Sequence, residues 1–154
     1  MEFGGTYRFS APRQTVWDAL NSTHVLGAAI PGCRRIDWTG DTTLECEIEV
    51  NFGVMSPVFL GDLTLSDVSP AQSYTLSGRG RGGLLGKAEA AARITLEDDG
   101  EATILAFRAE GGADGGIMKM GKALLKGSAQ KVIDGFFRRI GRAMDVEVTP
   151  LSPP

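Results

Sequence analysis

The chain has 154 residues, 42% of them hydrophobic, and carries a formal net charge of −3 at pH 7. This length suits one globular domain with one core, and the negative charge argues against a nucleic-acid-binding protein. Cys33 and Cys46 are isolated, so the sequence predicts neither a disulfide framework nor a metal-ligand cluster, and a reduced cytoplasmic setting fits them. No apolar run approaches the roughly 18 residues that span a bilayer, and residues 1–10 lack the pattern of a signal peptide, so we expect a soluble protein.

The N-terminal part of the chain predicts one strand followed by two short helices. Residues 2–9 alternate with a period of two, which is the pattern of a strand. Ser10 is placed to cap the helix that follows, and Pro12 suits its first turn. A second helix, over about residues 24–29, should end before Pro31, because proline disfavours helical geometry in the residue that precedes it.

The middle of the chain predicts six further strands, joined by short turn-rich links into an antiparallel meander. Their expected ranges are 34–39, 43–52, 58–68, 73–80, 87–97 and 102–109. In the second of these strands, Glu45, Glu47 and Glu49 alternate with apolar residues. One face of the sheet should therefore be solvated and the other covered.

One long helix, over about residues 116–145, is available to cover that face, because its apolar residues recur at steps of three and four. The sequence therefore predicts an α+β fold in which a curved antiparallel sheet of about seven strands wraps around the long C-terminal helix, with two short helices after the first strand. We expect residues 1–146 to form this domain. The proline-rich residues 147–154 are expected to be a tail or the start of a linker.

The covered side of two neighbouring strands carries small residues where a core would need large ones. Ala88, Ala90 and Ala92 share the apolar face of one strand, and Gly78 and Gly80 lie on the same face of the strand before it. Protein interiors are close-packed, so either a bulky neighbour fills this room or a cavity remains. We predict a cavity, and with it a ligand-binding protein.

The bulky neighbour of the alternative interpretation would be Trp17, Phe107 or Phe136. The residues predicted to line the pocket are Val50, Phe52, Phe59, Gly61, Leu63, Leu76, Gly78, Gly80, Ala88, Ala90, Phe107, Met120 and Leu124. Leu84 and Leu85 lie in the glycine-rich link between two strands, where consecutive leucines would be exposed unless they cover something or contact a partner. We predict that they form a gate or docking tip.

The long helix is strongly basic. Residues 117–142 carry a formal charge of +6, with Asp134 as their one acid, and the rest of the chain carries −9. Such a helix can approach anionic lipid or an acidic partner, although a charged stripe is also what a solvated helix face requires. The predicted membrane or partner contacts are Lys119, Lys122, Lys126, Arg138, Arg139 and Arg142.

No motif for catalysis, metal binding or nucleotide binding emerges. His24 is the only histidine, which excludes a multi-histidine metal site. Residues 78–83 satisfy the spelling G-x-G-x-x-G, but a dinucleotide site needs a helix after these glycines, and here a strand follows. We therefore predict no catalytic residues, no metal and no covalent cofactor.

Several short segments together carry a resemblance to a known family. They are Ala11-Pro12-Arg13 with Val16-Trp17, Ile30-Pro31-Gly32-Cys33, the glycine-rich residues 78–83, and Phe136-Phe137. From residue 1 to about residue 144 the chain resembles the carbon monoxide dehydrogenase CoxG family of the START-like (SRPBCC), helix-grip superfamily. The resemblance implies an accessory protein of molybdenum-containing carbon monoxide dehydrogenases and related hydroxylases, linked to their membrane attachment and to an apolar, quinone-like molecule.

Two functions are therefore weighed. The first is a non-catalytic protein that binds a quinone or lipid in the pocket, docks on a dehydrogenase, and is cytoplasmic or peripheral at the inner face of the cell membrane. The second is an enzyme of the same fold, a cyclase or hydratase acting on an aromatic or polyketide-like substrate. An enzyme would need polar side chains that converge in the pocket, and the strand alternation supplies almost none. We favour the first.

Overall fold

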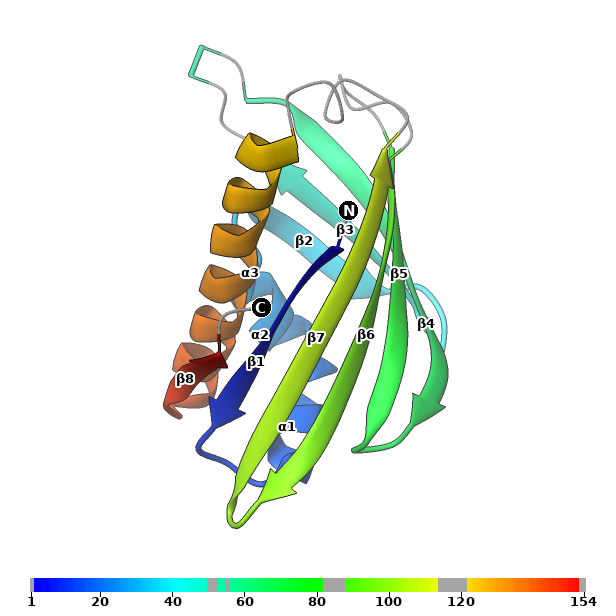
Figure 1. Ribbon diagram of the computed structural model, residues 1–154. Helices are drawn as coiled ribbons and strands as arrows, with labels where there is room; N and C mark the ends of the chain where they lie inside the picture. The colour runs from blue at the N-terminus through cyan, green and yellow to red at the C-terminus, as the bar shows by residue number, and fades with distance from the viewer. Residues whose placement is uncertain (1, 50–52, 55, 82–87, 114–121, 153–154) are drawn as a thin grey trace.

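The computed structural model describes residues 2–49, 53–54, 56–81, 88–113 and 122–152. In chain order, their elements are β1 (Glu2–Phe9), α1 (Arg13–Leu20), α2 (Thr23–Ala29), β2 (Cys33–Trp38), β3 (Thr43–Glu49), β4 (Val58–Ser69), β5 (Ser73–Arg81), β6 (Ala88–Asp99), β7 (Ala102–Ala113), α3 (Lys122–Met144) and β8 (Val148–Ser152). Figure 1 shows one curved sheet with α3 lying along its open side. The expected α+β arrangement is confirmed.

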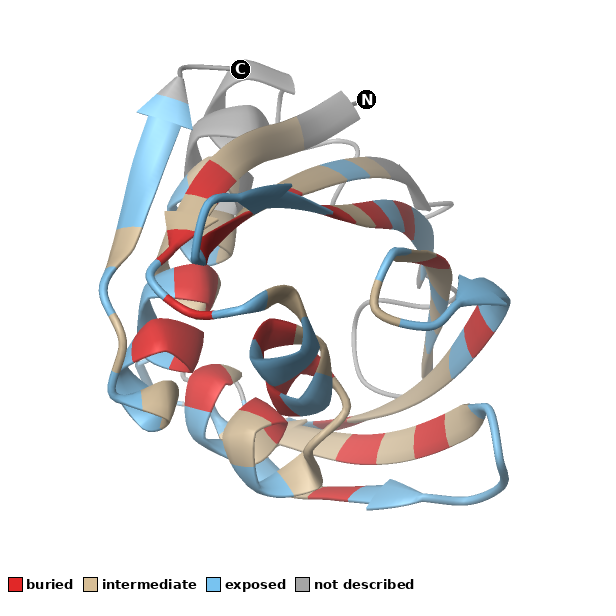
Figure 2. Ribbon diagram, turned by 90° about the horizontal axis from the view of Figure 1, so that it is seen from below, coloured by how far each residue is buried: buried red, intermediate tan, exposed pale blue. Residues whose placement is uncertain are grey.

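The strands form a single antiparallel sheet in the order β2-β3-β4-β5-β6-β7-β1-β8. Seen from below, they curve around the helices, and buried and exposed bands alternate along them (Figure 2). This alternation follows from the period of two along each strand, which directs successive side chains to opposite faces. The acidic residues of β3 lie on the outer face as expected: Glu49 is exposed and Glu45 and Glu47 are partly exposed, while Leu44 and Cys46 on the other face are buried.

The structure differs from the sequence analysis at the C-terminus, where a tail or linker was expected and β8 is found instead. After α3 the chain reverses at Asp145, which adopts φ 58°, and the amides of Asp145 and Val146 donate to the carbonyls of Arg142 and Gly141. These two bonds form a Schellman motif, which ends the helix and turns the chain back. Residues 148–152 then add to the edge of β1.

The helix ends follow local signals only in part. α2 is capped by Ser22, whose hydroxyl accepts a hydrogen bond from the Val25 amide at 3.3 Å, and it ends at Ile30, before Pro31, as predicted. The prediction that Ser10 caps α1 is wrong. The N-cap of α1 is Pro12, and the Ser10 amide donates instead to the Glu147 carbonyl just before β8.

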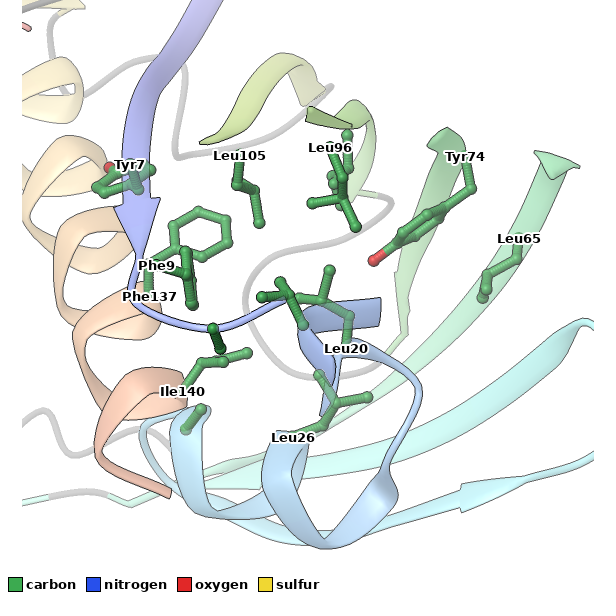
Figure 3. Close-up of a cluster of buried hydrophobic side chains, with 14 of the residues drawn as sticks. Tyr7, Phe9, Leu20, Leu26, Leu65, Tyr74, Leu96, Leu105, Phe137 and Ile140 are labelled. Carbon is green, nitrogen blue, oxygen red and sulfur yellow. The ribbon is translucent and has the colours of Figure 1, made fainter. Parts of the chain in front are cut away.

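The core is built around Phe137 of α3, which is fully buried. Its ring lies 4.7 Å from the ring of Tyr7, 5.5 Å from that of Phe107 and 5.1 Å from that of Phe136, measured between centroids. Phe9 completes the group, and Leu105 and Ile140 lie close by (Figure 3). Aromatic clusters of this kind bury large areas and favour tilted and edge-to-face geometries, so they hold α3 against β1 and β7.

Gly32 explains the Ile-Pro-Gly-Cys segment physically. It adopts φ +75°, and a Cβ at this position would lie 2.2 Å from the carbonyl oxygen of Glu49. The Glu49 amide donates to the Gly32 carbonyl at 2.8 Å, so the turn before β2 is bonded directly to the end of β3. Glycine is required here both for the backbone conformation and for the close approach.

A Gly32→Ala substitution should therefore destabilise the protein more than Gly100→Ala. Gly100 also has a positive φ, +63°, but no atom lies within 4 Å of its position for a Cβ. We expect Gly100→Ala to lower the free energy of unfolding by about 1 kcal/mol and Gly32→Ala to lower it by at least about 2 kcal/mol more, because of the clash with Glu49. Urea denaturation of both variants measures the difference, and equal losses would contradict the close approach.

Candidate ligand-binding site

Across β5, β6 and β7, the inner face of the sheet changes from large, buried side chains at one end to glycine and alanine at the other. At the end where α1 packs, Tyr74, Ile94, Leu96 and Leu105 are all less than 5% exposed. Toward the other end of the same face, the paired residues across β5, β6 and β7 are Gly78, Ala90 and Gly111 in one row and Gly80, Ala88 and Ala113 in the next. The packed core therefore occupies only part of the concave side.

The small-residue end of this face is open to solvent. Ala90 is exposed, although Ala92 and Ile94 on the same face of β6 are buried. Gly78 and Gly80, which pair with Ala90 and Ala88, are partly exposed. A well-packed core would cover these positions, so their accessibility favours room inside the sheet at this end.

The three bulky residues that would have filled this room pack elsewhere. Trp17 makes an edge-to-face contact with Tyr74, with ring centroids 5.3 Å apart, at the buried end of the sheet. Phe107 and Phe136 both contact Phe137. None of these contacts covers the exposed Ala90.

Two of the predicted glycines have a more local role than widening a pocket. A Cβ at Gly61 would lie 2.9 Å from the Cys46 sulfur, and a Cβ at Gly78 would lie 3.2 Å from Cδ2 of Leu63. Each glycine thus makes room for the side chain opposite it on the neighbouring strand. Burial raises the pKa of the Cys46 thiol, which keeps it protonated and unreactive as part of this wall.

The remaining predicted pocket residues are placed unevenly. Phe59 is buried, and Leu63, Leu76 and Phe107 are partly exposed on the inner face. Leu124 lies on α3 and Ala88 on β6. The predictions for Val50, Phe52, Met120, Leu84, Leu85 and Lys119 fall outside the described residues.

A polar cluster that the sequence analysis missed lies between β1 and α3. The hydroxyl of Tyr7 donates a hydrogen bond to Oδ1 of Asp134, and Nε2 of Gln130 donates to the same oxygen at 3.1 Å. Tyr7 is 1% exposed, and its side chain points toward α3 (Figure 3). The one available signal was the position of Asp134, three residues before the core residue Phe137, which places both near one side of the helix.

The environment keeps the Tyr7 phenol protonated. Burial, together with the hydrogen bond to Asp134 and its negative charge, raises the pKa of Tyr7 well above the ordinary 10.0. Burial alone raises the pKa of Tyr74 in the same direction. Tyr7 therefore acts as a fixed hydrogen-bond donor to Asp134 across the accessible pH range.

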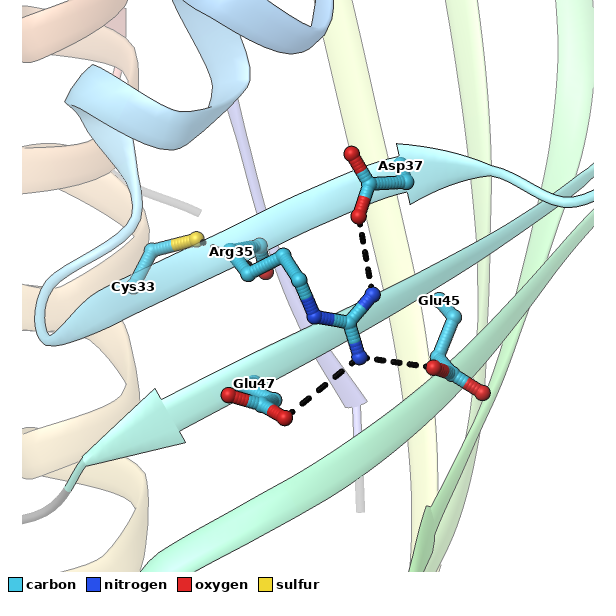
Figure 4. A network of polar contacts seen from close by, with 5 residues as sticks. All are labelled: Cys33, Arg35, Asp37, Glu45 and Glu47. Carbon is cyan, nitrogen blue, oxygen red and sulfur yellow. Dashed lines mark hydrogen bonds and ion pairs between the residues drawn. The ribbon is translucent and has the colours of Figure 1, made fainter.

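A second polar network lies on the outer face of the sheet and serves strand pairing. Arg35 of β2 contacts Asp37 at 2.8 Å, Glu45 at 2.7 Å and Glu47 at 3.5 Å, the last two from β3 (Figure 4). These contacts raise the pKa of the Arg35 guanidinium, with the hydrogen bonds to Asp37 and Glu45 as the main causes. The network lies on the face opposite the small residues, so it does not contribute to the candidate site.

The basic side chains in the C-terminal part of α3 face solvent. Lys131, Arg138, Arg139 and Arg142 are exposed, and none of them forms an ion pair with another residue in the described ranges. Lys122 and Lys126 lie in the first turns of the same helix. Asp134 is the exception, because it is partly buried against Tyr7.

The described residues offer neither a metal-binding cluster nor a membrane-spanning helix. No group of three or more His, Cys, Asp or Glu side chains there is placed to hold a metal ion, and His24 is exposed on α2. None of the helices in this part of the chain is both long and apolar enough to cross a bilayer.

Comparisons with known proteins agree on the fold and on one family. Residues 5–145 match the model of the CoxG family, which is described as a subunit of carbon monoxide dehydrogenase. No curated protein matches the chain.

Solved structures share the fold at low sequence identity. A conserved protein from Geobacillus kaustophilus is similar at 21% identity with a TM-score of 0.84, covering 96% of this chain and 99% of its own. Protein CV1439 from Chromobacterium violaceum is 12% identical with a TM-score of 0.75, covering 94% and 96%. A START superfamily protein from Mycobacterium smegmatis is 9% identical with a TM-score of 0.71, covering 94% and 97%. The expected START-like fold is confirmed.

The raised pKa values of Tyr7 and Tyr74 predict alkaline destabilisation. Above the ordinary pKa of 10.0 the unfolded chain releases both phenolic protons while the folded chain retains them, so the free energy of unfolding should fall as pH rises beyond about 10. Tyr7→Phe and Tyr74→Phe should each make this fall shallower. Urea denaturation between pH 8 and pH 11 measures the slope, and slopes unchanged by both substitutions would contradict the assignment.

Proposed function

Because the chain belongs to the CoxG family of carbon monoxide dehydrogenase subunits, we propose that it binds an apolar, quinone- or lipid-like molecule as a non-catalytic accessory protein. The family and the START-like fold already suggest a ligand-binding accessory role. The partner we propose is a molybdenum-containing carbon monoxide dehydrogenase or a related hydroxylase, which the protein couples to the cytoplasmic face of the membrane. The exposed Ala90 on the inner face of the sheet is the observation that carries the ligand-binding part.

Leaving the apolar residues of this face exposed to water has a free-energy cost that an apolar ligand would remove. The open end of the concave side is lined by Ala90, Gly78, Leu63 and Leu76, all at least partly exposed. Covering apolar surface contributes roughly 25 cal/mol per Å² removed from water. A flat or extended apolar molecule that lies against this wall would recover that energy.

The polar groups near this space support holding a ligand rather than converting it. Tyr7 donates to Asp134, and its raised pKa disfavours the phenolate that a base or nucleophile would require. The buried Cys46 thiol likewise has a raised pKa. Neither Tyr7 nor Cys46 is therefore available as a base or nucleophile at neutral pH, which favours the non-catalytic proposal over the enzyme.

The proposed membrane coupling rests on α3. Arg138, Arg139 and Arg142 are exposed without ion pairs to other described residues. Each cation near an anionic lipid surface contributes on the order of 1 kcal/mol. The same face would be attracted to an acidic surface on the partner enzyme.

Ala90→Trp should abolish ligand binding while the protein remains folded. The indole would occupy the open end of the inner face, whereas Ala91→Trp, one residue along β6, would place it on the outer face, where Ala91 is also exposed. Titration with a decyl-substituted benzoquinone should show at least a tenfold loss of affinity for Ala90→Trp and none for Ala91→Trp. Thermal denaturation of both variants should stay near the wild type.

Two results would contradict this proposal. Undiminished binding by Ala90→Trp would remove the pocket from this face. A large drop in the melting temperature of Ala90→Trp alone would mean that the space over Ala90 is filled, because overpacking a close-packed core typically costs about 1–3 kcal/mol.

Reversal of the charges at Arg138, Arg139 and Arg142 to Glu should abolish binding to anionic vesicles. A variant with the same net charge, in which the exposed Arg34, Arg93 and Arg108 of the sheet become Glu, should retain it. Sedimentation with phosphatidylglycerol and phosphatidylcholine vesicles at two salt concentrations measures both. Equal losses in the two variants would show a general charge effect and overturn the role of α3.

A further inference from the structure

The cluster of Tyr7, Asp134 and Gln130 lies beside the inner face of the sheet, not on the solvated outside of α3. Gly5, two residues before Tyr7 on the same face of β1, pairs with Phe107 of β7, and a Cβ at Gly5 would lie 3.0 Å from the Tyr7 hydroxyl. Phe107 in turn contacts Phe137. The polar cluster therefore stands next to the aromatic group that ends the packed core.

The residues around the cluster are open to solvent in part. Gly5, Phe107, Gln130 and Asp134 are all partly exposed, while the Tyr7 side chain beneath them is buried. A molecule lying on the inner face next to Phe107 and Gly5 would thus lie beside Asp134 and Gln130. The buried Tyr7 hydroxyl would hold the Asp134 carboxylate in place through its hydrogen bond to Oδ1.

Asp134 retains one oxygen for such a molecule. Oδ1 accepts from both Tyr7 and Gln130, and no described residue bonds to Oδ2. No buried side-chain oxygen or nitrogen lacks a partner in the described part of the chain, so Oδ2 is accessible. The Gln130 side chain is already engaged, because Nε2 donates to Oδ1 of Asp134 and a hydrogen bond from Gln130 to Tyr7 opposes part of the rise in the pKa of the phenol.

The cluster therefore offers one free acceptor, Oδ2 of Asp134. A hydroxyl group matches it, because it can donate its proton to the carboxylate oxygen. A ring carbonyl has no proton for the carboxylate, whose lone pairs would then face the carbonyl oxygen. Hydrogen bonds to charged groups are the stronger kind, so the carboxylate should decide the preference.

We propose that Asp134 recognises a hydroxyl group on the ring of the bound molecule, so that the protein prefers a quinol, or another apolar phenol, to the corresponding quinone. This inference rests on the proposed function and names the form of the ligand. It also explains why α3 carries an acid on its inner side among so many cations. A neutral amide at position 134 would still accept the Tyr7 hydrogen bond but would not discriminate between the two forms.

The test compares a decyl-substituted benzoquinone with its quinol, by anaerobic titration calorimetry on the full chain. The wild type should bind the quinol at least about tenfold more tightly. Asp134→Asn should bring the ratio of the two affinities toward one while binding of the quinone is retained. Asp145→Asn makes the same chemical change at an exposed position at the end of α3 and should leave the ratio unchanged.

The outcomes separate this inference from the proposed function. Equal affinities, or tighter binding of the quinone, in the wild type would overturn the inference and leave the proposed function standing. A quinol preference that persists in Asp134→Asn would overturn the assignment to Asp134. Failure of the wild type to bind either form would overturn both proposals. If Asp134→Asn does not fold, the ratio of the wild-type affinities for the quinol and the quinone still tests the inference.

Discussion

The packing of Phe137 against the curved sheet is the contact on which the rest of the structure depends. Phe137 is the fully buried residue where α3 meets β1 and β7, through its ring contacts with Tyr7, Phe9 and Phe107. These contacts hold α3 on the concave side together with its packing against α2, and Gly141 lets Val148 of β8 pack closely against the helix. The aromatic cluster in the C-terminal half of α3 thus joins the helix to β1 and β7.

The same contact explains why the concave side has two different halves. Large residues such as Leu105, Ile94 and Tyr74 fill the end of the sheet next to α1, and the core closes there. Beyond Phe107 the inner residues of β5, β6 and β7 become alanine and glycine, and the cluster of Asp134 with Tyr7 lies beside this boundary. The fold thus places a packed base and an accessible, mostly apolar wall in one molecule, with a carboxylate at the junction. The proposed binding function requires this division. The packed half of the core can keep the protein folded whether or not a ligand covers the accessible half.

Local patterns predicted much of this architecture, and long-range contacts account for what they did not predict. The alternation of Glu45 and Glu47 with buried residues and the end of α2 before Pro31 depend only on neighbours in sequence, and both are as expected. β8 depends on the edge of β1, at the other end of the chain, and on the reversal at Asp145, so its prolines indicated a linker. The bond between Tyr7 and Asp134 joins residues 127 apart, and a single acid in a basic helix gives no local sign that it faces inward. The alternation within each strand was predictable, whereas the faces that α3 turns toward each neighbour were not.

The proposed function requires that the open half of the concave face holds an apolar molecule. Native mass spectrometry of the freshly purified protein, together with analysis of an organic extract for quinone absorbance and lipid masses, detects such a molecule. We expect a stoichiometric apolar molecule that is released on denaturation. A mass equal to that of the bare chain, unchanged after incubation with quinones and lipids, would contradict it.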